Sequence, residues 1–198
     1  MSRRLGPPLP VLGSVVAAWV LMALAVALPG DGVSAFLVRL VEIVLAGGAA
    51  YLLDDSAAQM TVVTPRALWR RRAPALVSGM AVLAGAWAVI LLVLGRQVFP
   101  PSAAIISAEM VVLVAIALAL AAVLVWRGDP VPGSRVASVL GISGVTALIA
   151  EPLLRASIFL PMDGARDVSG WLAWSAAGIL AVAVTLVASR DPATRWRR

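Results

Sequence analysis

The sequence predicts an all-α, polytopic membrane protein with six transmembrane helices and with both termini in the cytoplasm. The chain is 62% hydrophobic and only 13% charged, whereas about 25% of the residues of a soluble domain are charged. Six apolar runs have the roughly 17–25 residues that an α-helix needs to cross a bilayer. Arginines flank these runs mainly on one side. We expect a single transmembrane domain over 1–198, with spans at about 11–28, 34–53, 75–95, 104–126, 136–154 and 170–188.

The arginines orient the spans, because the chain has no lysine and all 16 basic residues are arginine. Arg39 lies inside a span, and three more arginines lie in the loops expected outside, at Arg96, Arg155 and Arg166. Cytoplasmic loops carry an excess of basic residues, so the other twelve place both termini in the cytoplasm. These twelve are Arg3, Arg4, Arg66, Arg70, Arg71, Arg72, Arg127, Arg135, Arg190, Arg195, Arg197 and Arg198.

The first two spans are expected to form a hairpin. The 11–28 run ends at the sequence PGDG, at 29–32, whose glycines and proline predict a tight turn. Gly47 and Gly48 follow inside the second span. Since helices associate in lipid by close packing rather than by hydrophobicity, this glycine pair predicts a close contact with a neighbouring helix.

The loop at 54–73 is the longest one expected on the cytoplasmic side. The Thr-Pro pair at 64–65 is typical of a helix start, a capping residue followed by proline. Asp54 or Asp55 supplies an acidic side chain suited to the N-terminus of a second helix, and Pro74 is expected to open the next span. The loop is therefore predicted to form one or two amphipathic surface helices. An ordinary arginine-rich loop is the alternative.

The 136–154 span is irregular. Pro152 removes a backbone hydrogen bond to the Leu148 carbonyl and predicts a kink or a break. Non-helical backbone at membrane depth survives only where protein or a water-filled cavity covers it. We therefore expect a short re-entrant helix at about 152–160, within an outer re-entrant segment at about 152–168, before the last span begins.

Charged side chains lie within or just beyond the spans, where a central charge costs about 2.5–3.5 kcal/mol on insertion scales. Arg39 and Glu42 are three residues apart and can pair on one helix face, in the less favourable order. Glu151 and Arg155 are four apart, with Pro152 between them. The candidate polar residues of the membrane domain are Arg39, Glu42, Glu109, Glu151 and Arg155.

Two interpretations of these charges stay open. The five side chains could form the polar outer half of a translocation path. Alternatively, Arg39 and Arg155 extend to the outer interface and bring their carboxylates with them. Glu109 lies about one and a half turns into its span; it is either solvated, paired with one of the two arginines, or protonated.

Composition excludes several other functions. With no cysteine and no histidine, the chain lacks the usual thiolate and imidazole ligands and bases. No hydrolase, zinc-protease or phosphate-binding motif occurs, so we expect no catalytic, cofactor-binding or metal-binding residue and no enzyme activity in this chain. The net charge of +6 is explained by topology and anionic lipid, and we expect no nucleic-acid partner.

The order of these features resembles the ABC-2 type exporter permeases: six spans, cytoplasmic termini, a helical element between spans 2 and 3, and a broken span 5. The loop LLDDSAAQMTVVTPRALWRRR at 52–72 is also similar to small actinobacterial six-span membrane proteins that accompany ATP-binding-cassette (ABC) ATPases. The chain departs from better-known members in its short length and minimal loops.

The resemblance implies a permease subunit in a bacterial cytoplasmic (inner) membrane. Its partners would be an ABC ATPase, which binds the ATP and Mg, and a second permease, either a second copy of this chain or an unlike one. The exported substrate would be amphipathic or hydrophobic, passing through a cleft lined by spans 1, 2 and 5. The ATPase-coupling residues would be Asp54, Asp55, Arg66, Trp69, Arg70, Arg71 and Arg72.

Two other functions remain possible for such a chain. An ATP-independent channel or proton-linked carrier would use Glu42, Glu109 and Glu151 as its relay. A structural membrane subunit would only recruit a partner, and changes in its loop would abolish assembly rather than flux.

Overall fold

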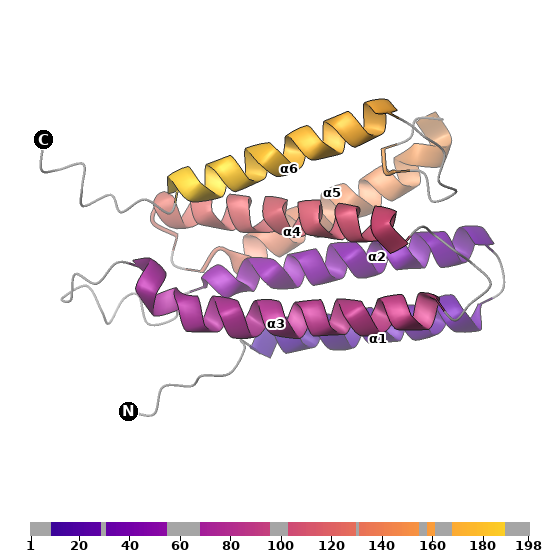
Figure 1. The fold of residues 1–198 in the computed structure, drawn as a ribbon, viewed down its shortest axis with the longest axis horizontal. Coiled ribbons are helices and arrows are strands. Elements are labelled where there is room, and N and C mark those ends of the chain that lie inside the picture. The colour runs from indigo at the N-terminus through magenta and orange to yellow at the C-terminus, as the bar shows by residue number, and fades with distance from the viewer. Residues whose placement is uncertain are drawn as a thin grey trace, which may run out of the picture.

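The computed structural model describes residues 9–28, 31–54, 68–95, 103–129, 131–154, 158–160 and 168–188. In these ranges the chain forms six long α-helices, each long and apolar enough to cross a membrane, and no strand. The all-α prediction is thereby confirmed for the described residues, and each expected span falls on one helix (Figure 1). The helices are α1 (Leu9–Ala27), α2 (Asp31–Ala50), α3 (Leu68–Leu94), α4 (Ala103–Trp126), α5 (Gly133–Leu154) and α6 (Val168–Ala188).

Successive helices run in opposite directions along the bundle, so that α1 begins and α6 ends at the same end (Figure 1). At this end α2 leads into a short 3₁₀ turn, η1 (Tyr51–Leu53), and α5 begins. We call it the η1 end. The opposite end is where α2 begins and α5 finishes.

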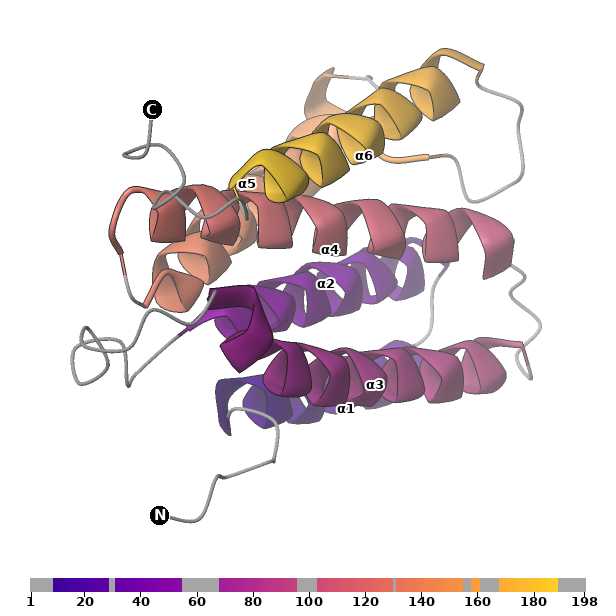
Figure 2. The same cartoon turned by 60° about the vertical axis from the view of Figure 1, so that its left-hand side comes forward.

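Helix α2 is the centre of the bundle. Of its apolar stretch, 72% is buried, against 6% for α6. Helices α1, α4 and α5 all pack on α2, whereas α6 packs mainly on α4, as the separate position of α6 in Figure 2 shows. The outward faces of α1, α5 and α6 carry large apolar side chains, which is what a lipid-facing surface requires.

Small residues let the central helices approach closely, as predicted for the glycine pair in the second span. A Cβ atom at Gly48 would lie 2.0 Å from Ser14 Oγ and 2.8 Å from Ser14 Cβ, so α1 and α2 meet there at backbone distance. On the other side of α2, a Cβ at Gly144 of α5 would lie 2.6 Å from Ile43 Cδ1. At both positions the helices can approach this closely because glycine has no side chain.

The helix that contains the third span is longer than the span itself. The part of α3 that is apolar enough to cross a membrane begins at Ala73, beside Pro74 as predicted, and residues 68–72 extend the same helix before it. Residues 64–65 lie outside the described residues. Proline cannot donate a hydrogen bond to the carbonyl four residues earlier, and the first turns of α3 lie at an angle to the rest (Figure 2).

The end of α5 also differs. Pro152 lies inside the helix, which ends two residues later at Leu154. The described residues 158–160 are not helical, so the expected helix over 152–160 is wrong for these three residues. Phe159 and Leu160 are nevertheless buried. The rest of the expected re-entrant segment, at 155–157 and 161–167, lies outside the described residues.

Candidate functional site

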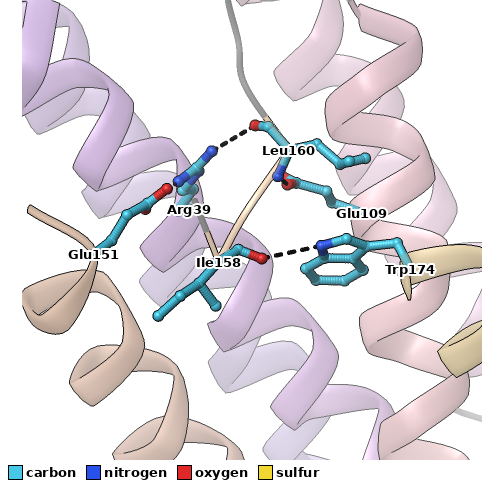
Figure 3. Close-up of polar contacts among 6 residues, drawn as sticks. All are labelled: Arg39, Glu109, Glu151, Ile158, Leu160 and Trp174. Atoms are coloured by element: carbon cyan, nitrogen blue, oxygen red, sulfur yellow. Dashed lines mark hydrogen bonds and ion pairs between the residues drawn. The ribbon is translucent and has the colours of Figure 1, made fainter. Parts of the chain in front are cut away.

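A buried polar cluster lies toward the opposite end of the bundle, where three helices and a short non-helical segment meet (Figure 3). Arg39 comes from α2, Glu109 from α4 and Glu151 from α5, and the segment is Ile158–Leu160. The sequence predicted these three residues as polar positions in different spans, and the structure brings them together. Arg155 lies outside the described residues.

Arg39 is the centre of this cluster. Its Nη1 lies 2.7 Å from Glu151 Oε2 and forms an ion pair, and its Nη2 donates a 2.7 Å hydrogen bond to the Leu160 carbonyl. The guanidinium also lies 4.4 Å from the centroid of the Phe159 ring, a distance at which a cation is attracted to an aromatic face. With 8% of its surface exposed, Arg39 is directed into the bundle.

The observed pairing differs from the one that spacing offered. Arg39 and Glu42 can pair by their spacing on one helix face, but Arg39 pairs with Glu151 on α5. The Arg39 side chain is buried within the described part of the chain. The guanidinium therefore connects two helices and a loop segment rather than neutralising a neighbour in sequence.

The 158–160 segment is held through its backbone. Non-helical backbone inside an apolar bundle needs polar partners for its N–H and carbonyl groups. The Leu160 N–H donates to Glu109 Oε1, the Leu160 carbonyl accepts from Arg39, and the Ile158 carbonyl accepts from Trp174 Nε1 at 3.1 Å. The segment is thereby attached to α2, α4 and α6.

Trp174 was not among the residues that the sequence predicted for this cluster. Its ring lies 6.1 Å from that of Phe159, at an interplanar angle of 34°. A signal was present in the sequence: Pro161 disfavours helical backbone at the residue before it, so the stretch at 158–160 is predicted to be non-helical. Such a stretch needs hydrogen-bond donors, and a nearby tryptophan supplies one.

Glu42 lies one turn further along α2 than Arg39 and is fully buried, with 0% of its surface exposed. Among the described residues, neither of its carboxylate oxygens has a hydrogen-bond partner, and the same holds for Glu109 Oε2 and Arg39 Nε. Glu109 and Arg39 are both within electrostatic range of Glu42. An ionised carboxylate buried without a partner is unfavourable by several kcal/mol.

At the η1 end, Asp54 connects α2 to α5. Its Oδ1 accepts a 2.7 Å hydrogen bond from the backbone N–H of Gly133, the first residue of α5. A carboxylate at a helix N-terminus satisfies a free N–H group and interacts favourably with the helix dipole. Only glycine fits at Gly133, because a Cβ there would lie 2.5 Å from Tyr51 Cδ1 and 2.7 Å from Asp54 Oδ2.

We expect Asp54→Ala to lower the free energy of unfolding by about 1 kcal/mol, the usual effect of removing a helix cap. The loss should be smaller in Asp54→Asn, which keeps an oxygen acceptor for the Gly133 N–H. Thermal unfolding in detergent, followed by circular dichroism, measures both. Equal midpoints for Asp54→Ala and the unchanged protein would contradict a capping role.

The other residues assigned to ATPase coupling are described only in part. Asp55 and Arg66 lie outside the described residues. The structure places the backbone of Trp69, Arg70, Arg71 and Arg72 in the first turns of α3, at the η1 end, and describes nothing of their side chains. Asp54 thus has a structural contact that its place in the loop did not predict.

Within the described ranges, no group of three or more acidic, histidine or cysteine side chains is placed to hold a metal ion. The polar atoms of the cluster instead bind one another and the backbone of the 158–160 segment. Such an arrangement can fix the relative positions of helices and hold protons. The chain matches no protein-family model, no curated protein and no solved structure.

Proposed function

We propose that this chain is the transmembrane permease subunit of an ABC exporter of the ABC-2 type, driven by a separate ATPase. The observation that supports this best is that α2 and α5 are tied together at both ends. Asp54 binds Gly133 at the η1 end, and Arg39 binds Glu151 toward the opposite end. A permease needs such a connection, because work done at one surface must reach the other.

In this proposal the ATPase acts on the loop at 54–73. Asp54 is the first residue of this loop and also caps α5, so a displacement of the loop at Asp54 would move α2 and α5 together. Arg39 and Glu109 hold the 158–160 segment toward the opposite end. A movement of α2 would therefore reach this segment through the Arg39 side chain.

The proposed substrate is amphipathic or hydrophobic. The described helices present mainly apolar side chains, and the charged groups inside the bundle are engaged with each other or fully buried. A second permease, either another copy or an unlike chain, would complete the path in the lipid bilayer. ATP and Mg would be bound by the ATPase, and this chain would have no catalytic role.

The test is a pull-down of the tagged chain from its native host in mild detergent, with Arg70, Arg71 and Arg72 each changed to glutamate. We expect a stoichiometric ATPase with the unchanged chain and a loss of about tenfold or more with the variant, because like charges across an interface are strongly unfavourable. The matched control is Arg135→Glu, a charge reversal at the same end on a side chain that is 72% exposed.

The control should retain the ATPase, and both variants should reach the membrane in the same amount as the unchanged chain. An ATPase that stays bound to the triple variant would contradict the proposed coupling site. If no ATPase accompanies the unchanged chain, the exporter proposal fails. Transport by the chain alone under a pH gradient would then identify a carrier, and a different co-purifying protein would identify a structural subunit.

A further inference from the structure

The polar cluster carries more negative charge than its arginine can balance. Among the described residues, one guanidinium, that of Arg39, faces three carboxyl groups: Glu42, Glu109 and Glu151. Arg39 is already engaged with Glu151 and with the Leu160 carbonyl. If all three carboxyl groups were ionised, two negative charges would remain without a counter-charge inside an apolar bundle.

No other helix packed on α2 supplies that counter-charge within the described ranges. Residues 9–28 of α1 contain no ionisable side chain, and neither does α3 beyond Arg72. On α4 the only ionisable residue inside the bundle is Glu109 itself, and on α5 the only arginine is Arg135 at the η1 end. Within the described part of the chain, protonation of one carboxyl group would remove one of the two excess charges, and the Leu160 N–H stabilises the other, on Glu109.

The position of Glu42 makes it the group that is neutralised. It lies near the middle of α2, the most buried helix, and is fully buried. Both of its oxygens lack a hydrogen-bond partner among the described residues, whereas Glu109 uses Oε1 for the Leu160 N–H and Glu151 uses Oε2 for Arg39. Glu42 is thus the carboxyl group with least to stabilise its charge.

We infer that Glu42, facing Glu109, forms a buried proton-binding site in which Glu42 is a neutral carboxylic acid at pH 7. The ligand is a proton rather than a metal cation. Hard cations take six or more oxygen ligands, whereas the site offers three unpartnered oxygens within the described part of the chain, two on Glu42 and one on Glu109. A proton needs only one.

The site borders the 158–160 segment through Glu109. One oxygen of Glu109 accepts a hydrogen bond from the Leu160 N–H (Figure 3), and the other has no hydrogen-bond partner among the described residues. A proton on Glu42 removes the repulsion that a second carboxylate would exert on Glu109. The proton is therefore what allows Glu109 to remain an acceptor for the backbone of the segment.

The sequence makes this inference directly testable, because Glu42, Glu109 and Glu151 are the only glutamates in the chain. The full chain is labelled with glutamate carrying ¹³C at the side-chain carboxyl and purified in a detergent without ester groups. Its infrared spectrum is recorded at pH 7, in parallel with an unlabelled sample. A carbonyl band of a protonated carboxylic acid that shifts with the label arises from these three residues alone.

We expect the label-sensitive acid band in the unchanged chain, and a fall to half of its intensity or less in Glu42→Gln. The comparison variant is Glu151→Gln, which removes the ion-paired carboxylate but keeps Glu42, and it should retain a label-sensitive acid band. Glutamine has the shape of a neutral glutamic acid, so Glu42→Gln should retain the thermal midpoint of the unchanged chain.

Three results would overturn the inference. The first is the absence of a label-sensitive acid band at pH 7 in the unchanged chain, a measurement that needs no variant. The second is a band that survives Glu42→Gln at full intensity. The third is a band that disappears when Na⁺ or K⁺ is added at constant pH, which would identify a cation as the occupant. None of these results depends on an ATPase partner.

Discussion

Replacing Arg39 with methionine is expected to lower the free energy of unfolding by about 3–5 kcal/mol, the usual effect of breaking a buried ion pair by removing one partner. The change removes the pair with Glu151, the hydrogen bond to the Leu160 carbonyl and the contact with the Phe159 ring. It also leaves the Glu151 carboxylate without its counter-charge. Thermal or denaturant unfolding of the purified chain in detergent measures the loss.

The chain contains a matched control for this experiment. Arg135 and Asp129 form an ion pair of the same length, 2.7 Å, but 72% of the Arg135 side chain is exposed. Exposed pairs contribute about 0–1 kcal/mol, so Arg135→Met should have little effect. Arg39→Met combined with Glu151→Gln should recover part of the loss, because the unpaired charge is removed as well. Equal effects of Arg39→Met and Arg135→Met would refute the buried cluster.

Introducing a single methyl group at the contact of α1 with α2 is expected to be the next most damaging change. Gly48→Ala would place a Cβ 2.0 Å from Ser14 Oγ and 2.8 Å from Ser14 Cβ. Rotation of the Ser14 hydroxyl would break its 2.8 Å hydrogen bond to the Val11 carbonyl and would not relieve the contact with Cβ. The helices must therefore separate, and overpacking of this kind costs about 1–3 kcal/mol.

A reciprocal exchange tests the same contact. Ser14→Gly removes both crowding atoms, and the next atom, Leu83 Cδ2, lies 3.8 Å from the new Cβ. The double variant Ser14→Gly/Gly48→Ala should therefore unfold close to the midpoint of the unchanged chain. Gly85→Ala is the control, because no other described atom lies within 4 Å of a Cβ there. A Gly48→Ala variant as stable as Gly85→Ala would show that α1 and α2 do not meet at this point.

The six helices could be predicted from the sequence because bilayer thickness fixes the length of an apolar run, whatever its partners. Helix ends were less predictable where proline occurs. Pro74 was expected to open a span and Pro152 to kink or break one, yet both lie inside continuous helices. A single missing N–H group bends a membrane helix without ending it when the turns on either side keep their own hydrogen bonds.

The polar cluster was predictable only as a set of residues. Charged side chains in apolar spans can be recognised in the sequence as members of a polar cluster, because each is unfavourable in lipid and must have a partner. The identity of the partner does not follow from spacing. Arg39 has Glu42 three residues away on its own helix, but it pairs with Glu151, 112 residues away. The distant carboxylate was preferred because Glu151 and the Leu160 carbonyl together engage both Nη atoms of the guanidinium.

The sequence by itself determined that this chain consists of apolar helices with a few charges among them, since length and composition are enough for that. Only the tertiary structure decided which helix is central. Helices α2 and α6 have nearly equal mean hydropathy, yet 72% of the first and 6% of the second is buried. The physical reason is that an apolar side chain is as stable against lipid as against protein. Burial is therefore set by small-residue contacts and by the partners that Arg39 and the glutamates require.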